Sequence, residues 1–307
     1  MARVLVVGAG VTGLSCAVRL LQRGHQVDVV ARDLPLETTS AVAAALWYPY
    51  LAHPVERVTA WAHPTYAELA RLAADPTTGV VLQPGTEVLR EAAPLPDWLA
   101  AVPQARTTSD LPPGYPAGWT FVAPVLEMPV YLQWLAGRIE ALGGTVTRRA
   151  LPALPDRAEV VVDASGLGAR LLADDPSVVP VRGQVLYVEK VGLDHWWLDQ
   201  AGPTYVVPRS GDVVVGGTEE HGAWDRKPDP DVAEALLRRA TALVPALRGA
   251  RVLGHRVGLR PARPAVRLEE TTSPAGSRLV HCYGHGGAGV TLSWGCADEV
   301  AAVVGDG

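Results

Sequence analysis

The chain has 307 residues, a formal net charge of −5 at pH 7 and 48% hydrophobic residues. This length exceeds what one hydrophobic core usually holds, so we expect two domains. The acidic balance and the lack of a basic run interleaved with aromatic residues argue against a nucleic-acid partner, and no window of about 18 apolar residues could span a membrane.

The first predicted unit is a nucleotide-binding motif near the N-terminus. Residues 4–7 are typical of a buried parallel strand, and the sequence Gly8-Ala9-Gly10-Val11-Thr12-Gly13 follows directly. Helical spacing over 14–23 ends at Gly24, and residues 27–30 predict a second strand. In this context the GxGxxG pattern predicts a dinucleotide site. The alternative is a tight turn in an unrelated α/β protein.

An acidic residue that binds the adenosine ribose is expected about 20 residues after these glycines. Asp33 stands there, next to Arg32. The order of the two leaves open which one faces the cofactor, since Arg32 could instead approach a phosphate or the adenine ring. The alternative is a pair of solvated loop charges.

The next part of the chain predicts both strands and helices. Residues 80–83 and 87–90 flank a Pro84-Gly85 turn and are expected to pair as a hairpin. Residues 129–142 have helical periodicity. Residues 160–163 form an apolar strand that ends in the small-residue turn Ala164-Ser165-Gly166, beside the nucleotide site.

A second hairpin is predicted from residues 205–208 and 213–216 around a turn at 209–212. Residues 257–264 are expected to be extended, because a residue before proline avoids the helical region. The order of elements implies an α/β fold with an interrupted nucleotide domain. Its pieces are the N-terminus, a middle section and the C-terminus, and mixed strands inserted between them form a substrate domain.

Residues 281–296 contain five glycines and lead into the start of a helix. Such a turn is a natural anion site, so we expect both ends of the chain to bind one cofactor. The glycines disfavour a helix between His281 and His285, which argues against a metal pair. Cys16, Cys282 and Cys296 form no CxxC pair and have no zinc-ligand spacing, so we expect buried, reduced thiols of a cytoplasmic protein.

Four blocks spread over nearly the whole chain resemble the D-amino acid oxidase family of flavoproteins. They are VVGAGVTGLS at 6–15, VAAALWYPY at 42–50, RPARP at 260–264 and YGHGGAG at 283–289. The resemblance implies a Rossmann-like domain that binds FAD, formed by 1–50, 121–184 and 264–307. It also implies an inserted mixed-sheet α+β domain for the substrate, formed by 51–120 and 185–263. The implied reaction oxidises a neutral or basic D-amino acid with oxygen to a 2-oxo acid, ammonia and hydrogen peroxide.

The motifs and the resemblance together assign a set of residues to FAD. They are Gly8, Ala9, Gly10, Val11, Thr12, Gly13, Arg32, Asp33, Ala44, Ala45, Trp47, Ser165, Gly166, Gly286, Gly287, Ala288, Gly289, Val290 and Thr291. Trp47 and Tyr48 are expected at the boundary between flavin and substrate, with core packing as the alternative.

The resemblance also implies how a substrate is held. Arg260 matches the family's substrate-binding arginine, a side chain that holds a carboxylate in bidentate geometry. Tyr205 matches a tyrosine whose hydroxyl meets the same carboxylate, and the carbonyl of Gly287 is the implied partner of the amine. From the residues alone, Arg260 could instead pair with Glu269 or Glu270, and Tyr205 could form a cross-strand aromatic pair.

Two regions depart from the family pattern. Ala201 stands where mammalian members carry a lid tyrosine, and the stretch 190–203 is shorter, so we expect no lid of the mammalian type. Glu219 and Glu220 follow the second hairpin, where the acidic-substrate branch carries arginine. If their side chains face the pocket, they would repel D-aspartate and favour D-arginine or D-lysine. The alternative, which the sequence supports equally, is that they face solvent.

Other functions remain open at this point. An oxidase of D-aspartate or of glycine and sarcosine would use the same fold, an NAD-dependent dehydrogenase would use the same N-terminal motif, and a flavin-binding protein could lack catalysis. Arg260 and Tyr205 argue against a non-catalytic flavin-binding protein, because such a protein needs no carboxylate clamp.

The expected partners are a D-amino acid and oxygen, without nucleic acid or membrane, and a homodimer is left open. No signal peptide or peroxisomal tripeptide is expected, which favours the cytoplasm.

Overall fold

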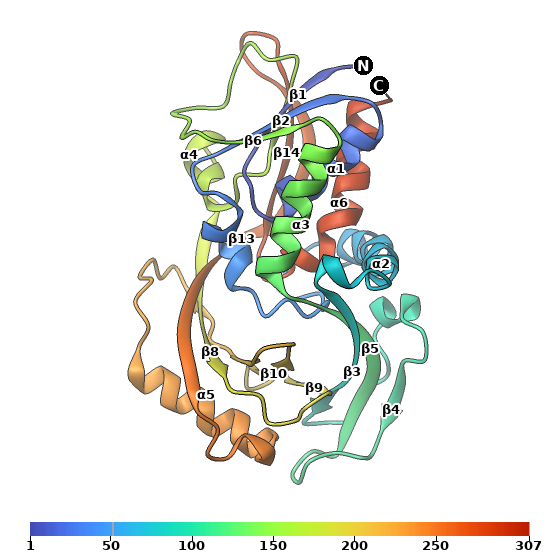
Figure 1. The fold of residues 1–307 in the computed structure, drawn as a ribbon, viewed down its shortest axis with the longest axis vertical. Coiled ribbons are helices and arrows are strands. Elements are labelled where there is room, and N and C mark those ends of the chain that lie inside the picture. Colours follow the sequence, from blue (N-terminus) through green and yellow to red (C-terminus); the bar gives the residue numbers. More distant parts are fainter. Residues whose placement is uncertain (51, 307) are drawn as a thin grey trace.

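One continuous, curved sheet runs through the whole molecule, and its two ends form the cores of two halves (Figure 1). The structure, a computed structural model, describes residues 1–50 and 52–306. The strands are β1 (Arg3–Val7), β2 (Gln26–Ala31), β3 (Val80–Leu89), β4 (Arg106–Thr108), β5 (Ala117–Leu126), β6 (Thr145–Arg148), β7 (Val160–Asp163), β8 (Val179–Val188), β9 (Trp196–Asp199), β10 (Thr204–Pro208), β11 (Val213–Gly216), β12 (Glu220–His221), β13 (Val252–Thr272) and β14 (Arg278–His285). The α-helices are α1 (Val11–Gln22), α2 (Val55–Leu72), α3 (Met128–Ala141), α4 (Ala169–Leu172), α5 (Pro230–Leu243) and α6 (Gly289–Val304).

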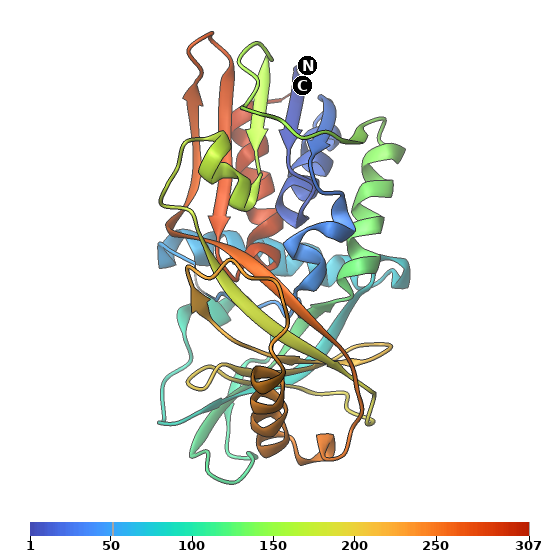
Figure 2. The same ribbon diagram turned by 90° about the vertical axis from the view of Figure 1, so that its left-hand side faces the viewer.

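The half that holds both chain termini is built on five parallel strands in the order β14-β7-β1-β2-β6 (Figures 1 and 2). The helices α1, α3 and α6 pack together on one face of these strands. The strands predicted at 4–7, 27–30 and 160–163 are confirmed, as is the helix predicted at 129–142. The helix predicted from residue 14 is also present, although it begins earlier, at Val11.

The turn from β1 to α1 packs tightly against the end of β7. A Cβ atom at Gly13 would overlap the carbonyl oxygen of Gly8, and a Cβ atom at Gly8 would overlap the carbonyl oxygen of Ala164. These glycines therefore let α1 begin directly at the carboxyl edge of the parallel strands. That edge is where open α/β sheets bind their ligands.

The second half is a mixed sheet that hangs from two long strands, β8 and β13, which cross between the halves (Figure 2). Val252 to Ala262 of β13 pair with β8, and Ala262 to Thr272 pair with β14. The second predicted hairpin is confirmed as β10 and β11, and the extended segment 257–264 lies within β13. The expected domain boundaries at 120/121, 184/185 and 263/264 fall inside β5, β8 and β13, so that division stays a prediction.

The hairpin predicted at 80–83 and 87–90 is wrong. Residues 80–83 and 87–89 belong to β3, a single strand that pairs along its whole length with β5 and also pairs in parallel with β9. A Cβ atom at Gly85 would overlap the ring of Trp196, whose Nε1 donates to the carbonyl of Gln83 at 2.9 Å. Gly85 therefore makes room for a tryptophan distant in sequence and does not form a turn.

The helix α6 is buried along most of its surface between α1 and α2. The indole of Trp294 is fully buried and donates to the Tyr131 hydroxyl at 2.8 Å. Gly295 lies directly against α2, where a Cβ atom would overlap the carbonyl oxygen of Trp61, and its N–H donates to Thr65 Oγ1 at 2.9 Å. No helix within the described residues is long and apolar enough to cross a lipid bilayer.

The close contact at Gly295 gives a test of this packing. We expect Gly295→Ala to lower the free energy of unfolding by at least about 2 kcal/mol, because the added methyl group forces α6 away from α2. Gly137→Ala in α3 is the control, since a Cβ atom there meets nothing within 4 Å. It should be neutral or stabilise by up to ~1 kcal/mol. Denaturant unfolding followed by circular dichroism measures both, and equal effects would contradict the packing described.

Candidate active site

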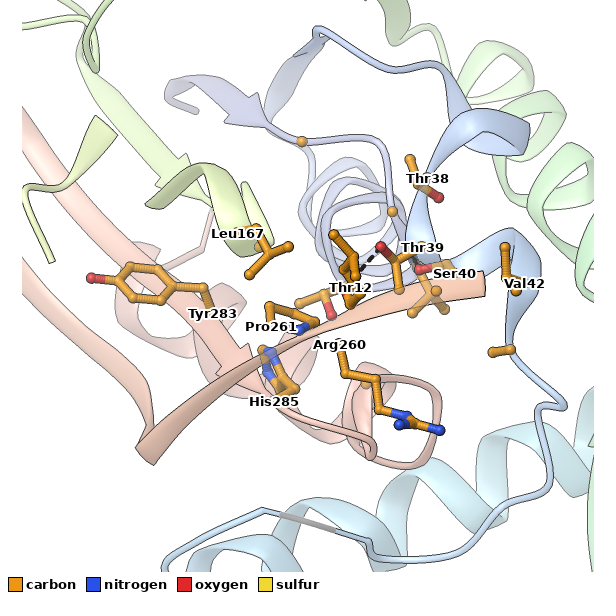
Figure 3. A pocket seen from close by; sticks show the side chains of 18 of the residues that line it. Thr12, Thr38, Thr39, Ser40, Val42, Leu167, Arg260, Pro261, Tyr283 and His285 are labelled. Carbon is orange, nitrogen blue, oxygen red and sulfur yellow. Dashed lines mark hydrogen bonds between the residues drawn. The ribbon is translucent and has the colours of Figure 1, made fainter. Parts of the chain in front are cut away.

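A cavity of about 570 Å³ lies where the two halves of the sheet meet. Its wall combines the ends of β1 and β7, the N-termini of α1 and α6, and residues of β8, β10 and β13. Figure 3 shows Thr12, Ser40, Arg260 and His285, which reach this region from four separate segments. The cavity therefore depends on contacts between both ends and the middle of the chain.

Most of the residues that the sequence assigns to FAD line this cavity. They are Gly8, Ala9, Gly10, Val11, Thr12, Arg32, Asp33, Ala44, Ala45, Ser165, Gly166, Gly286, Gly287, Gly289 and Val290. The expected substrate residues Arg260 and Tyr205 line it as well. The fold thus brings the N-terminal motif, the C-terminal glycine loop and the expected carboxylate clamp into one space.

Gly13, Trp47, Ala288 and Thr291 lie behind the cavity wall. The indole of Trp47 is fully buried, packs edge-on against Tyr66 and donates to the carbonyl of Ala62 at 3.2 Å. The structure therefore places Trp47 in the core and not at the cavity wall, which is the core-packing alternative.

Thr291 lies behind the wall because its hydroxyl is used within the protein. Its Oγ1 accepts from the N–H of Tyr48 at 3.0 Å and donates to the carbonyl of Tyr48 at 2.9 Å. This bridge ties the first turn of α6 to the segment 42–50. Tyr48 itself lines the cavity, as expected.

Two helix N-termini open into the cavity, and neither helix is capped by the side chain of its own N-cap residue. The residues at these positions are Gly10 for α1 and Ala288 for α6. Ser40 Oγ accepts from the N–H of Val11 at 3.1 Å. Backbone N–H groups and the helix dipole favour negative charge at such ends. The cavity is therefore suited to a ligand with anionic groups near both helices.

Arg32 and Asp33 form a bidentate ion pair with each other, at 3.0 Å and 2.6 Å. The hydrogen bond from Arg32 lowers the pKa of Asp33 below its usual value. Both residues line the cavity, together with Arg226 from the other half of the molecule. A contact of Arg32 or of Asp33 with the cofactor stays a prediction.

The guanidinium of Arg260 has no carboxylate partner within residues 1–50 and 52–306. Glu269 pairs with Arg267 at 2.7 Å and Glu270 pairs with Arg278 at 2.7 Å, so both alternative partners are occupied elsewhere. Arg260 Nη1 donates to the carbonyl of Thr218 at 2.9 Å. A positive charge held in a cavity wall by a neutral acceptor is available to an anionic ligand.

The position of Arg260 is fixed by its surroundings. Its guanidinium packs over the backbone of Gly183, where a Cβ atom would overlap it. The ring of Tyr50 lies on another side, with its centroid 6.0 Å from Arg260 Cζ. A Cβ atom at Gly287 would in turn overlap the ring of Tyr50, so the glycine loop and the arginine are in contact with the same tyrosine.

Tyr205 lies on β10 beside this arginine. Burial raises the pKa of its hydroxyl, against the opposing effect of the Arg260 guanidinium, so the hydroxyl keeps its proton and can donate. The connection from β9 to β10 spans only residues 200–203. The expectation that a lid of the mammalian type is missing stays a prediction.

The two glutamates after the second hairpin have different places. Glu219 Oε2 accepts from the Tyr50 hydroxyl at 2.6 Å, and this hydrogen bond lowers the pKa of Glu219. Glu220 pairs with the buried Arg182 at 2.5 Å. Neither lines the cavity, but the carboxylate of Glu219 contacts a tyrosine that does.

Several lining residues were not assigned from the sequence. Tyr50 ends the block at 42–50 that resembles the family, and its aromatic ring beside a proline was the available signal. Ser40, Leu198, Val207 and Arg226 carried no signal, because only the tertiary fold brings them to the cavity.

A buried carboxyl group lies next to the cavity wall. Glu87 is 1% exposed and accepts from the Tyr48 hydroxyl at 2.9 Å and 3.0 Å. Burial raises its pKa from 4.5 to about 7. The folded chain therefore holds a proton between these pH values that the unfolded chain loses. The stability gained from this proton is complete below about pH 4.5 and disappears as the pH rises through about 7.

We expect Glu87→Gln to remove this pH dependence. Relative to the variant, the wild-type chain should lose on the order of 3 kcal/mol of unfolding free energy between pH 4.5 and pH 8. Denaturant unfolding at several pH values measures this difference. The exposed Glu91→Gln is the control and should keep the wild-type profile. Parallel profiles for wild type and Glu87→Gln would refute the buried proton.

The residues present fit FAD, the cofactor that the sequence implies. The N-terminus of α1 faces the cavity at Gly8, Gly10 and Thr12, as a pyrophosphate requires. The N-terminus of α6 and the glycine loop offer N–H groups to the polar edge of a flavin. Both lie along one cavity, so a single extended dinucleotide can reach both.

Several known proteins are similar to this chain in sequence. The D-amino-acid oxidase of Rubrobacter xylanophilus is 56% identical to this chain over 314 residues, which cover 99% of this chain and 96% of the relative. The D-amino-acid oxidase of Streptomyces coelicolor is 47% identical and covers 97% of this chain and 95% of the relative. The D-aspartate oxidase of Homo sapiens is 39% identical over 99% of this chain and 94% of the relative.

The same fold occurs in the solved structure of glycine oxidase from Bacillus cereus. It has a TM-score of 0.81 and 19% identity, and covers 99% of this chain and 95% of that chain. The family model of the FAD dependent oxidoreductases (DAO) matches residues 3–303. The chain therefore belongs to the DAO family of FAD-dependent oxidoreductases.

Proposed function

We propose that this protein catalyses the FAD-dependent oxidative deamination of neutral or basic D-amino acids. The products are a 2-oxo acid, ammonia and hydrogen peroxide, with molecular oxygen as the electron acceptor. One observation carries the proposal. Arg260 presents to the cavity that holds the FAD motifs a guanidinium that pairs with no carboxylate of the described residues. The two relatives named D-amino-acid oxidase, at 56% and 47% identity, support the same reaction.

The substrate carboxylate binds to Arg260 and Tyr205. A guanidinium forms two parallel hydrogen bonds with a carboxylate, which fixes both position and orientation. The Tyr205 hydroxyl, kept protonated by burial, adds a third donor. Thr218 and Gly183 hold the guanidinium in place before substrate arrives, so little reorganisation is needed on binding.

The substrate amine is placed by the glycine loop. We assign the carbonyl of Gly287 as its acceptor, since Gly287 lines the cavity and lies against Tyr50, the neighbour of Arg260. When bound, FAD supplies the acceptor for the hydride that leaves the α-carbon. The protein's contribution is then orientation: a carboxylate and an amine held at two points leave one hydrogen of the α-carbon directed at the cofactor.

The charges near the clamp favour neutral or basic side chains. Glu219 is ionised, since its pKa is lowered, and it lies against Tyr50 at the margin of the cavity. A second carboxylate on the substrate would meet this negative charge, whereas a cationic side chain would be attracted to it. We therefore favour neutral and basic D-amino acids over D-aspartate. Glycine and sarcosine lack the side chain that this part of the cavity would contact.

A cytoplasmic location and the oligomeric state, including a homodimer, stay predictions.

Replacement of Arg260 tests the clamp. We expect Arg260→Met to raise KM for D-alanine on the order of a hundredfold, because the carboxylate loses its paired charge. FAD content should be unchanged. Peroxide production over a panel of D-alanine, D-arginine, D-aspartate, glycine and sarcosine gives KM and kcat/KM for each.

The control variant is Arg256→Met, on the same strand. Arg256 does not line the cavity and donates to the carbonyl of His255 at 2.9 Å. It should keep wild-type kinetics. Near-normal turnover in Arg260→Met would refute the clamp, and a preference of the wild type for D-aspartate or glycine would overturn the proposed substrate class.

A further inference from the structure

Two cysteines and a histidine that are separated in sequence come together in the wall of the cavity. Cys282 lies on β14, His285 ends that strand, and Cys296 lies on α6. All three are buried, and their ligand atoms, two sulfurs and a ring nitrogen, lie within 4.8 Å of one another. The sequence showed no zinc-ligand spacing, because the glycine loop reverses the chain between the first two residues and the third.

These side chains have little else to bind. Cys282 Sγ lies 4.0 Å from His285 Nε2, and this is the hydrogen-bonding contact that the His285 ring makes within the described part of the chain. The ring is 3% exposed. An imidazole buried to this degree normally has a strong partner, and a contact at 4.0 Å to sulfur is a weak one.

The arrangement is close to that of a metal site. Zinc binds sulfur at ~2.3 Å and histidine nitrogen at ~2.0 Å, which separates tetrahedral ligand atoms by roughly 3.5–3.8 Å. The observed separation of 4.0 Å between Cys282 Sγ and His285 Nε2 needs only a small rotation of the side chains to reach this range. Two thiolates and a neutral imidazole also balance the charge of a divalent ion, so the bound ion adds no net charge to a buried site.

A third buried thiol, Cys16 on α1, belongs to the same hydrophobic core as Cys282 and Cys296. It is not among the three residues whose ligand atoms lie within 4.8 Å of one another.

We propose that Cys282, His285 and Cys296 form a binding site for a thiophilic divalent cation such as Zn²⁺. Cys282 and His285 line the cavity, whereas Cys296 does not, so the ion binds within the cavity wall. There it joins β14 to α6 across the glycine loop. The ion is separate from the proposed oxidation, which needs no metal.

Zinc binding to the full-length chain tests this site. Tag-free protein, loaded with FAD and kept reduced, is freed of metal by a chelator and dialysed against buffered Zn²⁺. Bound zinc is then measured by mass spectrometry of the metal. We expect one zinc ion per chain, and at least tenfold weaker binding in Cys296→Ser with FAD content unchanged.

The matched control is Cys16→Ser, which alters an equally buried neighbouring thiol and should bind zinc as the wild type does. His285→Gln gives a second variant if Cys296→Ser does not fold, and it too should bind zinc at least tenfold more weakly. The proposal is overturned if the wild type binds no zinc, or if Cys296→Ser and Cys16→Ser bind equally. None of these outcomes depends on the oxidase activity.

Discussion

The packing of α1 against α6 is the contact on which the rest of the structure depends, because it brings the two ends of the chain together. Arg19 on α1 pairs with Asp298 on α6 at 2.7 Å, and His25 Nε2 lies 2.8 Å from the carbonyl oxygen of Gly305. Both helices then open with their N-termini on the same cavity. A cofactor with anionic groups at two places along its length needs this arrangement, and neither helix provides it alone.

The strand β13 connects this cofactor space with the substrate space. It pairs with β8 at one end and with β14 at the other, so Arg260 is held in a continuous ladder of backbone hydrogen bonds. Ala262, two residues further along, lies opposite His285, where the glycine loop begins. Arg260 and the start of the glycine loop are therefore parts of one continuous sheet, which would suit a reaction that depends on orientation. Tyr50 adds a second link, since it contacts both Arg260 and Gly287.

The sequence predicted the structure correctly wherever the local pattern and the motif agreed. The strands and helix around Gly8 to Gly13 and the hairpin of β10 and β11 lie where they were expected. Arg260 and Tyr205 line the cavity, and their role as a clamp stays a prediction. The prediction from sequence was wrong where a contact with a residue distant in the chain determines the local structure. Gly85 looked like a turn but accommodates Trp196, and Trp47 lies in the core. The contacts of Tyr50 and the convergence of Cys282 with Cys296 arise only after the sheet and α6 have packed.

The most direct measurement is the absorbance spectrum of the purified, FAD-loaded protein without oxygen, before and after addition of D-alanine, D-valine or D-arginine. The L-enantiomers serve as controls. Because the clamp fixes the carboxylate and the amine relative to the flavin, we expect the D-forms alone to bleach the flavin bands. A yellow protein that no D-amino acid bleaches, or that the L-forms bleach equally well, would contradict the proposed reaction.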